Sequence, residues 1–153
     1  MALRNVITIS EENLLRRVSR PVTEFDARLA VLLDDMRETL KAQNGAGLAA
    51  PQIGILRRAV LCDLDGKIVE MMNPVITAAK GEEDDVEGCL SVPGKRGRVV
   101  RPAALTVTAQ DRHGKPFKVK VKGYAARVVC HEVDHLDGIL YTDKARSIEV
   151  VKG

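Results

Sequence analysis

Two histidines and a glutamate near the end of the chain carry the clearest chemical signal. They form the pattern His131-Glu132-x-x-His135 within the segment CHEVDHLDG. On a helix the two histidines lie within about 40° of each other, so both imidazoles can reach one metal ion. Glu132 lies on the flank of the same face, where its carboxylate can accept a proton from water without being a ligand. The pattern therefore predicts a metal site with its own general base.

The same pattern also occurs by chance on the solvated faces of amphipathic helices. In this chain the residues before it, AARVVC, are mostly apolar, which indicates a buried helix. Buried ionisable groups without partners are costly, and a metal ion would be such a partner. We therefore favour a metal site over a chance motif.

A catalytic site of this kind needs a third protein ligand and one open position. The position at which metzincins carry a third histidine holds Tyr141, which excludes that class. The only glutamate after His135 is Glu149, close to the end of the chain, which makes it a poor ligand. The third histidine of the chain, His113, lies in the turn-like segment DRHGKP.

The three cysteines are the remaining candidates. Cys62 lies in the apolar segment AVLCDLD and is typical of a buried core thiol. Cys130 points about 100° away from the adjacent His131 along a helix. Cys89 lies in DDVEGCLSVPG, where a thiolate could complete a Cys/His/His set with an open fourth position. Three unclustered cysteines also favour a reducing compartment over a disulfide framework.

Helices and strands must bring these segments together. The segment TEFDARLAVLLDDMRETLKAQNG predicts the clearest helix, with Thr23 as its N-cap and an end at Asn44 and Gly45. The metal motif belongs to a predicted helix from about 124 to 136, stopped by Gly138. A short helix ended by Pro21 is expected near the N-terminus.

Strands are expected between the two long helices. The segment RRAVLCDLDGKIVEMMNP predicts a hairpin around Asp65 and Gly66. The segment GRVVRPAALTVTAQDRHGKPFKVKVKG predicts two more strands joined by a turn at His113 and Gly114, and residues 80–85 predict an exposed loop. We expect an α+β fold with mostly antiparallel strands packed around a central metal-binding helix, in a single domain over residues 1–153.

The composition limits the class of protein. A hydrophobic content of 45%, a charged content of 29% and a net charge of +3 describe an ordinary globular chain. With two Phe, two Tyr and no Trp, few side chains are available to stack on bases, so we expect no dedicated nucleic-acid site. No apolar run approaches the length of a membrane span, and the start MALRNVITIS lacks a secretory signal. We therefore expect a cytoplasmic protein without a membrane partner.

Three sequence blocks together resemble one known family. They are GAGLAAPQ at residues 45–52, EGCLS at residues 87–91 and HEVDH at residues 131–135. In this order and spacing they resemble the peptide deformylases, and the resemblance covers nearly the whole chain. It implies removal of the formyl group from the N-terminal formylmethionine of new proteins.

The resemblance also implies roles for particular residues. The metal ligands would be Cys89, His131 and His135, and Glu132 would be the general acid and base. An oxyanion site would consist of the Gln52 side-chain amide and the Leu90 backbone N–H. The family's metal is usually Fe²⁺, and a thiolate with two imidazoles also suits Ni²⁺, Co²⁺ or Zn²⁺.

The substrate is expected to contact the first two blocks and the metal helix. GAGLAA spells a dinucleotide fingerprint, but it follows a helix and runs into Pro51, so we favour a loop that lets backbone approach a ligand. Arg101 is the expected ion-pair partner of Glu87, and Asp134 could either support a ligand or form an ordinary salt bridge. The predicted substrate-binding residues are Gly45, Ala46, Gly47, Val86, Glu87, Tyr124 and Val128.

Two departures from the family pattern and two rival functions complete the expectations. Cys130 replaces a common glutamine, with an expected effect on packing but not on ligation. The chain stops at KARSIEVVKG, which leaves a tail-mediated contact with the ribosome near its exit tunnel in doubt.

The rival functions are a zinc endopeptidase and a metal-binding module without activity. Both Glu132 and Gln52 are present, which favours the bacterial-type deformylase.

Overall fold

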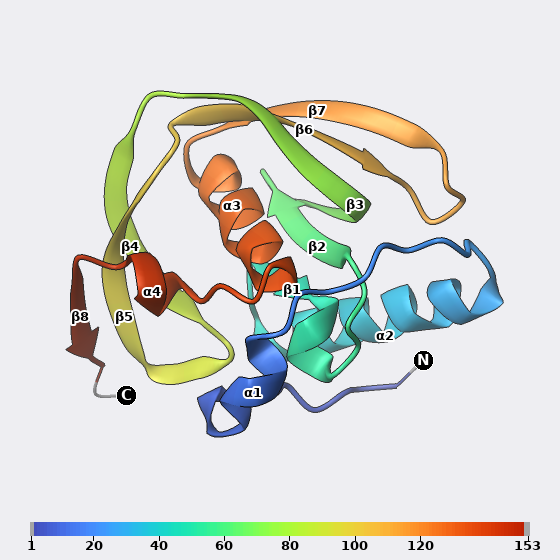
Figure 1. Ribbon diagram of the computed structural model, residues 1–153, viewed down its shortest axis with the longest axis horizontal. Coiled ribbons are helices and arrows are strands. Elements are labelled where there is room, and N and C mark those ends of the chain that lie inside the picture. The colour runs from blue at the N-terminus through green and yellow to red at the C-terminus, as the bar shows by residue number, and fades with distance from the viewer. Residues whose placement is uncertain (1, 152–153) are drawn as a thin grey trace.

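The computed structural model describes residues 2–151 and contains two antiparallel sheets and a central helix (Figure 1). The larger sheet has the strand order β1-β2-β3-β6-β7, and the smaller one has the order β4-β5-β8. The strands are β1 (Gly47–Ala49), β2 (Ala59–Leu64), β3 (Lys67–Lys80), β4 (Glu83–Cys89), β5 (Val92–Arg101), β6 (Ala104–Gln110), β7 (Pro116–Lys122) and β8 (Ser147–Val150). All pairings between these strands are antiparallel, which confirms the predicted α+β class.

The helical segments differ greatly in length. They are η1 (Ile9–Glu11), α1 (Glu12–Leu15), α2 (Ala27–Gln43), η2 (Ala50–Ile53), α3 (Tyr124–Leu136) and α4 (Tyr141–Lys144). Within the described part of the chain, no helix is long and apolar enough to cross a membrane.

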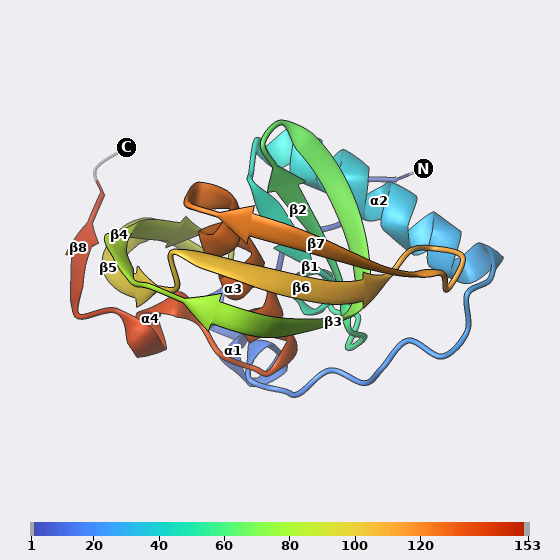
Figure 2. The ribbon, with the colours of Figure 1, turned by 90° about the horizontal axis from the view of Figure 1, so that it is seen from above.

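Helix α3 lies under the arch formed by β3, β6 and β7 (Figures 1 and 2). It matches the predicted bounds, and 11 of its 13 residues are buried. Its apolar side chains pack with residues of β2, β6 and β7 into one core cluster. The helix ends as predicted, with Gly138 in the left-handed region at φ 73°. Burial on nearly all sides keeps the polar groups of this helix out of bulk water.

Helix α2 covers the other side of the larger sheet and begins later than the sequence suggested. Asp26 is its N-cap, because its side chain accepts a hydrogen bond from Leu29 N at 3.1 Å. Thr23 was therefore wrongly predicted as the cap. The predicted end is confirmed, with Asn44 in the left-handed region. The buried side chains of its apolar stripe are Leu29, Leu33, Met36 and Leu40.

The predicted turns are confirmed, but the number of strands differs. Asp65 and Gly66 both have positive φ in the β2–β3 turn, and residues 111–115 connect β6 to β7. The segment from residue 97 to 123 contributes to three strands and not two, because β5 ends at Arg101 and β6 begins after Pro102, which has no N–H to donate.

Two further segments also differ from prediction. Within the expected loop at residues 80–85, Lys80 ends β3 and the last three residues begin β4. The first helix ends at Leu15, well before Pro21.

Candidate metal centre

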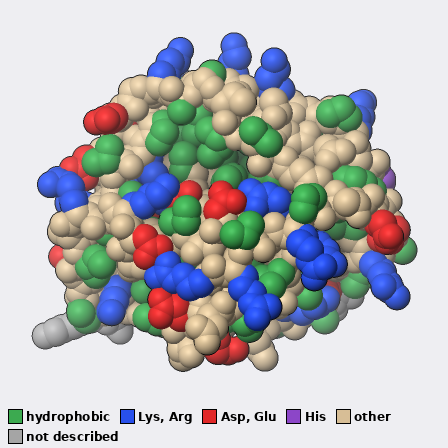
Figure 3. All heavy atoms as spheres, viewed as in Figure 1, with side chains coloured by type: hydrophobic (Ala, Val, Ile, Leu, Met, Phe, Trp, Pro, Cys, Tyr) green, Lys and Arg blue, Asp and Glu red, His purple; other side chains and the backbone are tan. Residues whose placement is uncertain are grey.

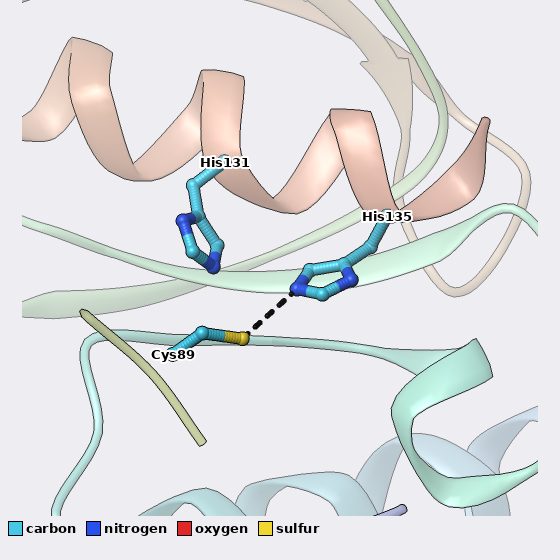
Figure 4. A group of neighbouring side chains, drawn as sticks. All are labelled: Cys89, His131 and His135. Atoms are coloured by element: carbon cyan, nitrogen blue, oxygen red, sulfur yellow. Dashed lines mark hydrogen bonds between the residues drawn. The ribbon is translucent and has the colours of Figure 1, made fainter. Parts of the chain in front are cut away.

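Three side chains from two elements converge at one point. Cys89 ends β4, and His131 and His135 lie one turn apart on α3. Their potential ligand atoms all lie within 4.8 Å of one another, and Cys89 Sγ is 3.3 Å from His135 Nε2 (Figure 4). Both histidines are buried, whereas Cys89 is only partly so. Among residues 2–151 this is the only Cys/His/Asp/Glu group with such spacing, and it excludes Cys62 and Cys130.

The chemistry of this group fits a divalent metal ion. One thiolate and two imidazoles form a soft, mixed donor set with room for a fourth ligand. Burial holds the pKa of His135 well below its ordinary value, so the ring is in the neutral form that can bind a metal. Within the described residues, Glu132 Oε1 and His135 Nδ1 are buried without a hydrogen-bond partner. Such atoms are rare in folded proteins and indicate a place for a further polar group.

Glu132 lies beside the ligands in a nearly water-free setting. Its exposed fraction is 4%, and burial raises the pKa of its carboxyl to about 7. A group with such a pKa can both accept and donate a proton near neutral pH. Gly47 on β1 permits this placement, because a Cβ there would lie 2.6 Å from Glu132 Oε2.

His131 is held by a buried ionic network. Glu87 Oε1 lies 2.9 Å from His131 Nδ1, and Arg101 donates to both Glu87 oxygens at 2.8 and 2.9 Å. Burial raises the pKa of Glu87, but the hydrogen bonds from Arg101 and His131 outweigh this effect and lower it to about 2. The ionised carboxylate therefore accepts from His131 Nδ1 and makes Nε2 the nitrogen that would bind a metal. Burial lowers the pKa of His131, but hydrogen bonds to Cys89 and Glu87 outweigh this effect and raise it well above its ordinary value, so a metal at Nε2 would displace a proton.

Arg127 is a member of this network that the sequence reasoning missed. It donates to Glu87 Oε2 at 2.7 Å and to the backbone carbonyls of Val99 and Glu83, each at 2.8 Å. These bonds join α3 to β4 and β5. A single charged residue in the apolar run AARVVC was the signal that could have identified it, because a buried charge requires partners.

The structure also tests the two expectations about Arg101 and Asp134, the charged residues near the metal ligands. The predicted pair between Arg101 and Glu87 is confirmed. Asp134 forms salt bridges with Arg101 and Lys144, at 2.6 and 3.0 Å. It therefore forms ion pairs and, through Arg101, is also connected to the network that orients His131.

Gln52 has a fixed orientation beside the thiolate. Its Oε1 accepts from Ala49 N at 2.9 Å, and its Nε2 lies 3.1 Å from Ser91 Oγ and 3.7 Å from Cys89 Sγ. The amide nitrogen thus faces the site, as an oxyanion donor requires. Ser91 was not predicted, although it belongs to the EGCLS block. Tyr141 was also missed as a neighbour, and its ring is stacked 6.0 Å from that of His131.

A cavity of about 300 Å³ opens onto these groups. Tyr124 is 66% exposed at its mouth, whereas Val128 is 5% exposed within it. The cavity contains all the predicted site residues except His135, and it also contains Gly88 and Arg127. Its lining is Gly45, Ala46, Gly47, Gln52, Val86, Glu87, Gly88, Cys89, Leu90, Tyr124, Arg127, Val128, His131 and Glu132. The structure therefore brings the three sequence blocks together, while the roles of their residues stay predictions.

Comparisons with known proteins agree over nearly the whole chain. The family model described as polypeptide deformylase matches residues 3–151. A peptide deformylase from Caldicellulosiruptor bescii is 52% identical over 144 residues, covering 94% of this chain and 86% of the relative. One from Acetivibrio thermocellus is 49% identical over 144 residues, covering 94% and 84%.

Solved structures show the same similarity. The crystal structure of a peptide deformylase from Thermotoga maritima has a TM-score of 0.92 and 34% identity, covering 96% of this chain and 100% of that one. A peptide deformylase structure from Legionella pneumophila has a TM-score of 0.90 and 41% identity, covering 94% and 86%.

Proposed function

Because this chain belongs to the polypeptide deformylase family, we propose that Cys89, His131 and His135 hold its catalytic metal ion. The protein is a metal-dependent hydrolase that removes the formyl group from the N-terminal formylmethionine of newly synthesised proteins and releases formate. The observation that carries the residue assignment is the convergence of one cysteine and two histidines beside the cavity.

We assign the proton transfers to Glu132. When bound, the metal supplies Lewis acidity, which activates water and polarises the formyl carbonyl. Glu132 takes a proton from the attacking water and returns one to the leaving amine, a double role that suits a carboxyl with a pKa of about 7. The Gln52 amide and the Leu90 N–H donate hydrogen bonds to the oxygen on which negative charge develops.

The rest of the cavity would bind the first residue of the peptide. The methionine side chain would pack against apolar groups, and the peptide backbone would lie along the loop with the two glycines. Glu87 would contribute only backbone groups, because its carboxylate is occupied by His131 and two arginines. The residues assigned to substrate binding are Gly45, Ala46, Gly47, Val86, Glu87, Tyr124 and Val128.

Several finer points belong to the same proposal. We propose Fe²⁺ as the native ion, since the donor set suits it, although Ni²⁺, Co²⁺ or Zn²⁺ would fit the same ligands. We also propose that residues 1–153 act as one catalytic domain in the cytoplasm, on nascent peptides near the ribosome. The family match over residues 3–151 supports the single domain.

Metal content of two cysteine variants tests the ligand set. Cys89→Ala should lose the metal, because the site loses its only thiolate. Cys130→Ser should keep it, since Cys130 lies outside the converging group. The measurement is metal analysis of anaerobically purified protein. Loss of metal from the Cys130 variant, with retention in the Cys89 variant, would overturn the assignment.

Turnover of a metal-loaded variant tests the role of Glu132. Glu132→Gln keeps the shape of the side chain but cannot accept a proton, so turnover should fall by about 10² to 10⁴. Formate release from formyl-Met-Ala-Ser, with mass spectrometry of the products, measures the effect. Near-normal turnover by this variant would contradict the role, and cleavage of an internal peptide bond by the wild type would favour an endopeptidase.

A further inference from the structure

The outer face of the larger sheet is open where β3, β6 and β7 lie side by side. Figure 2 shows these strands in front of the molecule, and no helix within residues 2–151 crosses them. Alternate residues of β6 point in opposite directions, so that Leu105 and Val107 belong to the core around α3. Thr106 and Thr108 therefore belong to the opposite, outer face. This face differs from the inner one in having no partner layer.

Lysines are concentrated on this outer face. Lys118, Lys120 and Lys122 alternate along β7 and are all exposed. Lys80 at the end of β3 is also exposed and pairs with Ala104, as does Lys122 on the other side of β6. Figure 3 shows basic side chains standing along the upper edge, where Figure 1 places β7. We refer to Lys80, Lys118, Lys120 and Lys122 as the lysine stripe.

The charge of the lysine stripe is not balanced nearby. Within the described part of the chain, no side chain of the stripe forms a salt bridge or a hydrogen bond, whereas Arg37, Arg58 and Arg112, for example, are paired. Residues 73–80, 104–110 and 116–122 contain no Asp or Glu. The four charges exceed the net charge of the whole chain, +3, so the other residues are together slightly negative.

Protection of an exposed strand edge is the simplest explanation of such lysines. Strand β7 is the edge of its sheet, and charged side chains on edge strands prevent pairing between molecules. This explanation accounts for the three lysines of β7. It accounts neither for Lys80, which lies two strands inward, nor for the lack of any acidic residue in residues 73–80, 104–110 and 116–122. A ligand with extended negative charge explains both.

We propose that the lysine stripe is a docking surface for the phosphate backbone of RNA. Alternate residues of a strand are about 6.6 Å apart, so the stripe offers a linear series of positive charges to a linear polyanion. The partly exposed Thr108 lies on the same face, opposite Lys118, and its hydroxyl can donate to a phosphate oxygen. The exposed residues of these strands include no aromatic side chain, so the contact reads no sequence and agrees with the expected lack of a base-stacking site.

The activity and the position of the stripe support RNA over other polyanions. The inference rests on the deformylase function, whose substrate is a newly made chain and therefore arises beside ribosomal RNA. Lys122 lies two residues before Tyr124, which stands at the mouth of the cavity. A membrane surface is disfavoured, because Val75 is the only large hydrophobic side chain exposed on the described residues of these three strands.

RNA affinity of two matched variants tests this proposal. The stripe variant carries Lys118→Gln, Lys120→Gln and Lys122→Gln. The control carries Arg17→Gln, Lys41→Gln and Lys67→Gln, which removes the same charge from exposed residues elsewhere that form no salt bridge within residues 2–151. Fluorescence anisotropy with a labelled 20-nucleotide single-stranded RNA is measured between 50 and 200 mM KCl.

The stripe variant should bind this RNA at least tenfold more weakly than the wild type at 50 mM KCl. Its slope of log affinity against log salt should be smaller by about 2, as expected for the loss of three phosphate contacts. The control should change the affinity by less than about threefold. Equal affinities and slopes for the two variants would overturn the proposal.

Three further measurements separate the alternatives. Both variants should release formate from formyl-Met-Ala-Ser at the wild-type rate; a defect confined to RNA binding then supports the proposal without depending on the site residues. Tighter binding of the wild type to phosphatidylserine vesicles or polyglutamate than to RNA would overturn it. Self-association of the stripe variant with unchanged RNA affinity would also overturn it, in favour of edge protection alone.

Discussion

Two glutamates of this protein are each bound by two arginines, and the two pairs of arginines differ in burial. Glu87 contacts Arg101 and Arg127, and all three side chains are at most 4% exposed. Glu70, whose side chain is 9% exposed, contacts Arg37 and Arg112, whose side chains are 43% and 26% exposed. The hydrogen-bond lengths are similar in the two clusters, between 2.7 and 2.9 Å. Any difference in their effect must therefore come from their surroundings.

The two clusters connect different parts of the fold. Glu70 lies on β3, with Arg37 on α2 and Arg112 in the β6–β7 turn, so this cluster joins α2 to the larger sheet near solvent. The Glu87 cluster joins α3 to the smaller sheet and also reaches His131. Water reaches the arginines of the first cluster and screens its ion pairs, whereas it reaches no member of the second. The comparison predicts that the same substitution has different consequences at the two glutamates.

The largest effect is expected for Glu87→Gln. The change leaves two buried arginines without their shared carboxylate, and breaking a buried ion pair costs about 3–5 kcal/mol. His131 also loses the acceptor that orients it, so metal affinity should fall about 10- to 100-fold. Urea unfolding and competition with a chelator measure the two losses. If Glu87→Gln kept both the stability and the metal affinity of the wild type, burial would not distinguish the Glu87 cluster from the Glu70 cluster.

A smaller effect is expected for Arg127→Met. The variant keeps the apolar stem of the side chain and leaves Glu87 paired with Arg101, but it deprives two backbone carbonyls of their donor. Unsatisfied buried acceptors cost about 1–3 kcal/mol. Metal affinity should change less than in Glu87→Gln, because Glu87 still accepts from His131. The same two measurements apply, and a larger metal defect than in Glu87→Gln would contradict this order.

Glu70→Gln should have little effect. Partly exposed ion pairs contribute about 0–1 kcal/mol, so the free energy of unfolding should fall by no more than that. Metal content and formate release should equal those of the wild type, because Glu70 touches none of the cavity residues. A loss of metal in this variant would show that the outer cluster also supports the site.

The pH dependence of this small difference provides the finest test. Burial raises the pKa of Glu70, but hydrogen bonds from Arg112 and Arg37 outweigh it, so the pKa lies below the ordinary value of 4.5. The stabilisation by the carboxylate is therefore present above pH 4.5 and lost as the pH falls through the lower, folded-state pKa. The stability difference between wild type and Glu70→Gln, measured by urea unfolding, should shrink in acid. A stability difference that grows as the pH falls would contradict the lowered pKa of Glu70. Glu24→Gln, at an exposed position, serves as the control.

Local features of the fold were predictable from the sequence. The bounds of α3 and the turns at residues 65–66 and 113–114 follow from patterns within a few residues. The start of α2 was wrong because several residues could cap it, and only the backbone direction selects Asp26 over Thr23. Arg127 and Tyr141 were missed as site neighbours because they act through contacts with distant elements.

The sequence by itself determined the types of chemical group and their spacing on one helix. His131 and His135 lie on one face of any helix that contains them, because the helical repeat is fixed over so short a distance. Three blocks in order were also enough to identify the family. These properties depend only on neighbouring residues or on the order of residues along the chain.

Only the tertiary structure decided how distant groups meet. Cys89 reaches His135 across 46 positions because β4 ends beside α3. Glu132 and Glu87 are both buried, but only Glu87 has hydrogen-bond partners that bring its pKa below the ordinary value. The pairing of Lys80 and Lys122 with the same residue of β6 depends likewise on strand register. Such contacts depend on the packing of whole elements, and burial then sets the strength of each charge through the loss of water.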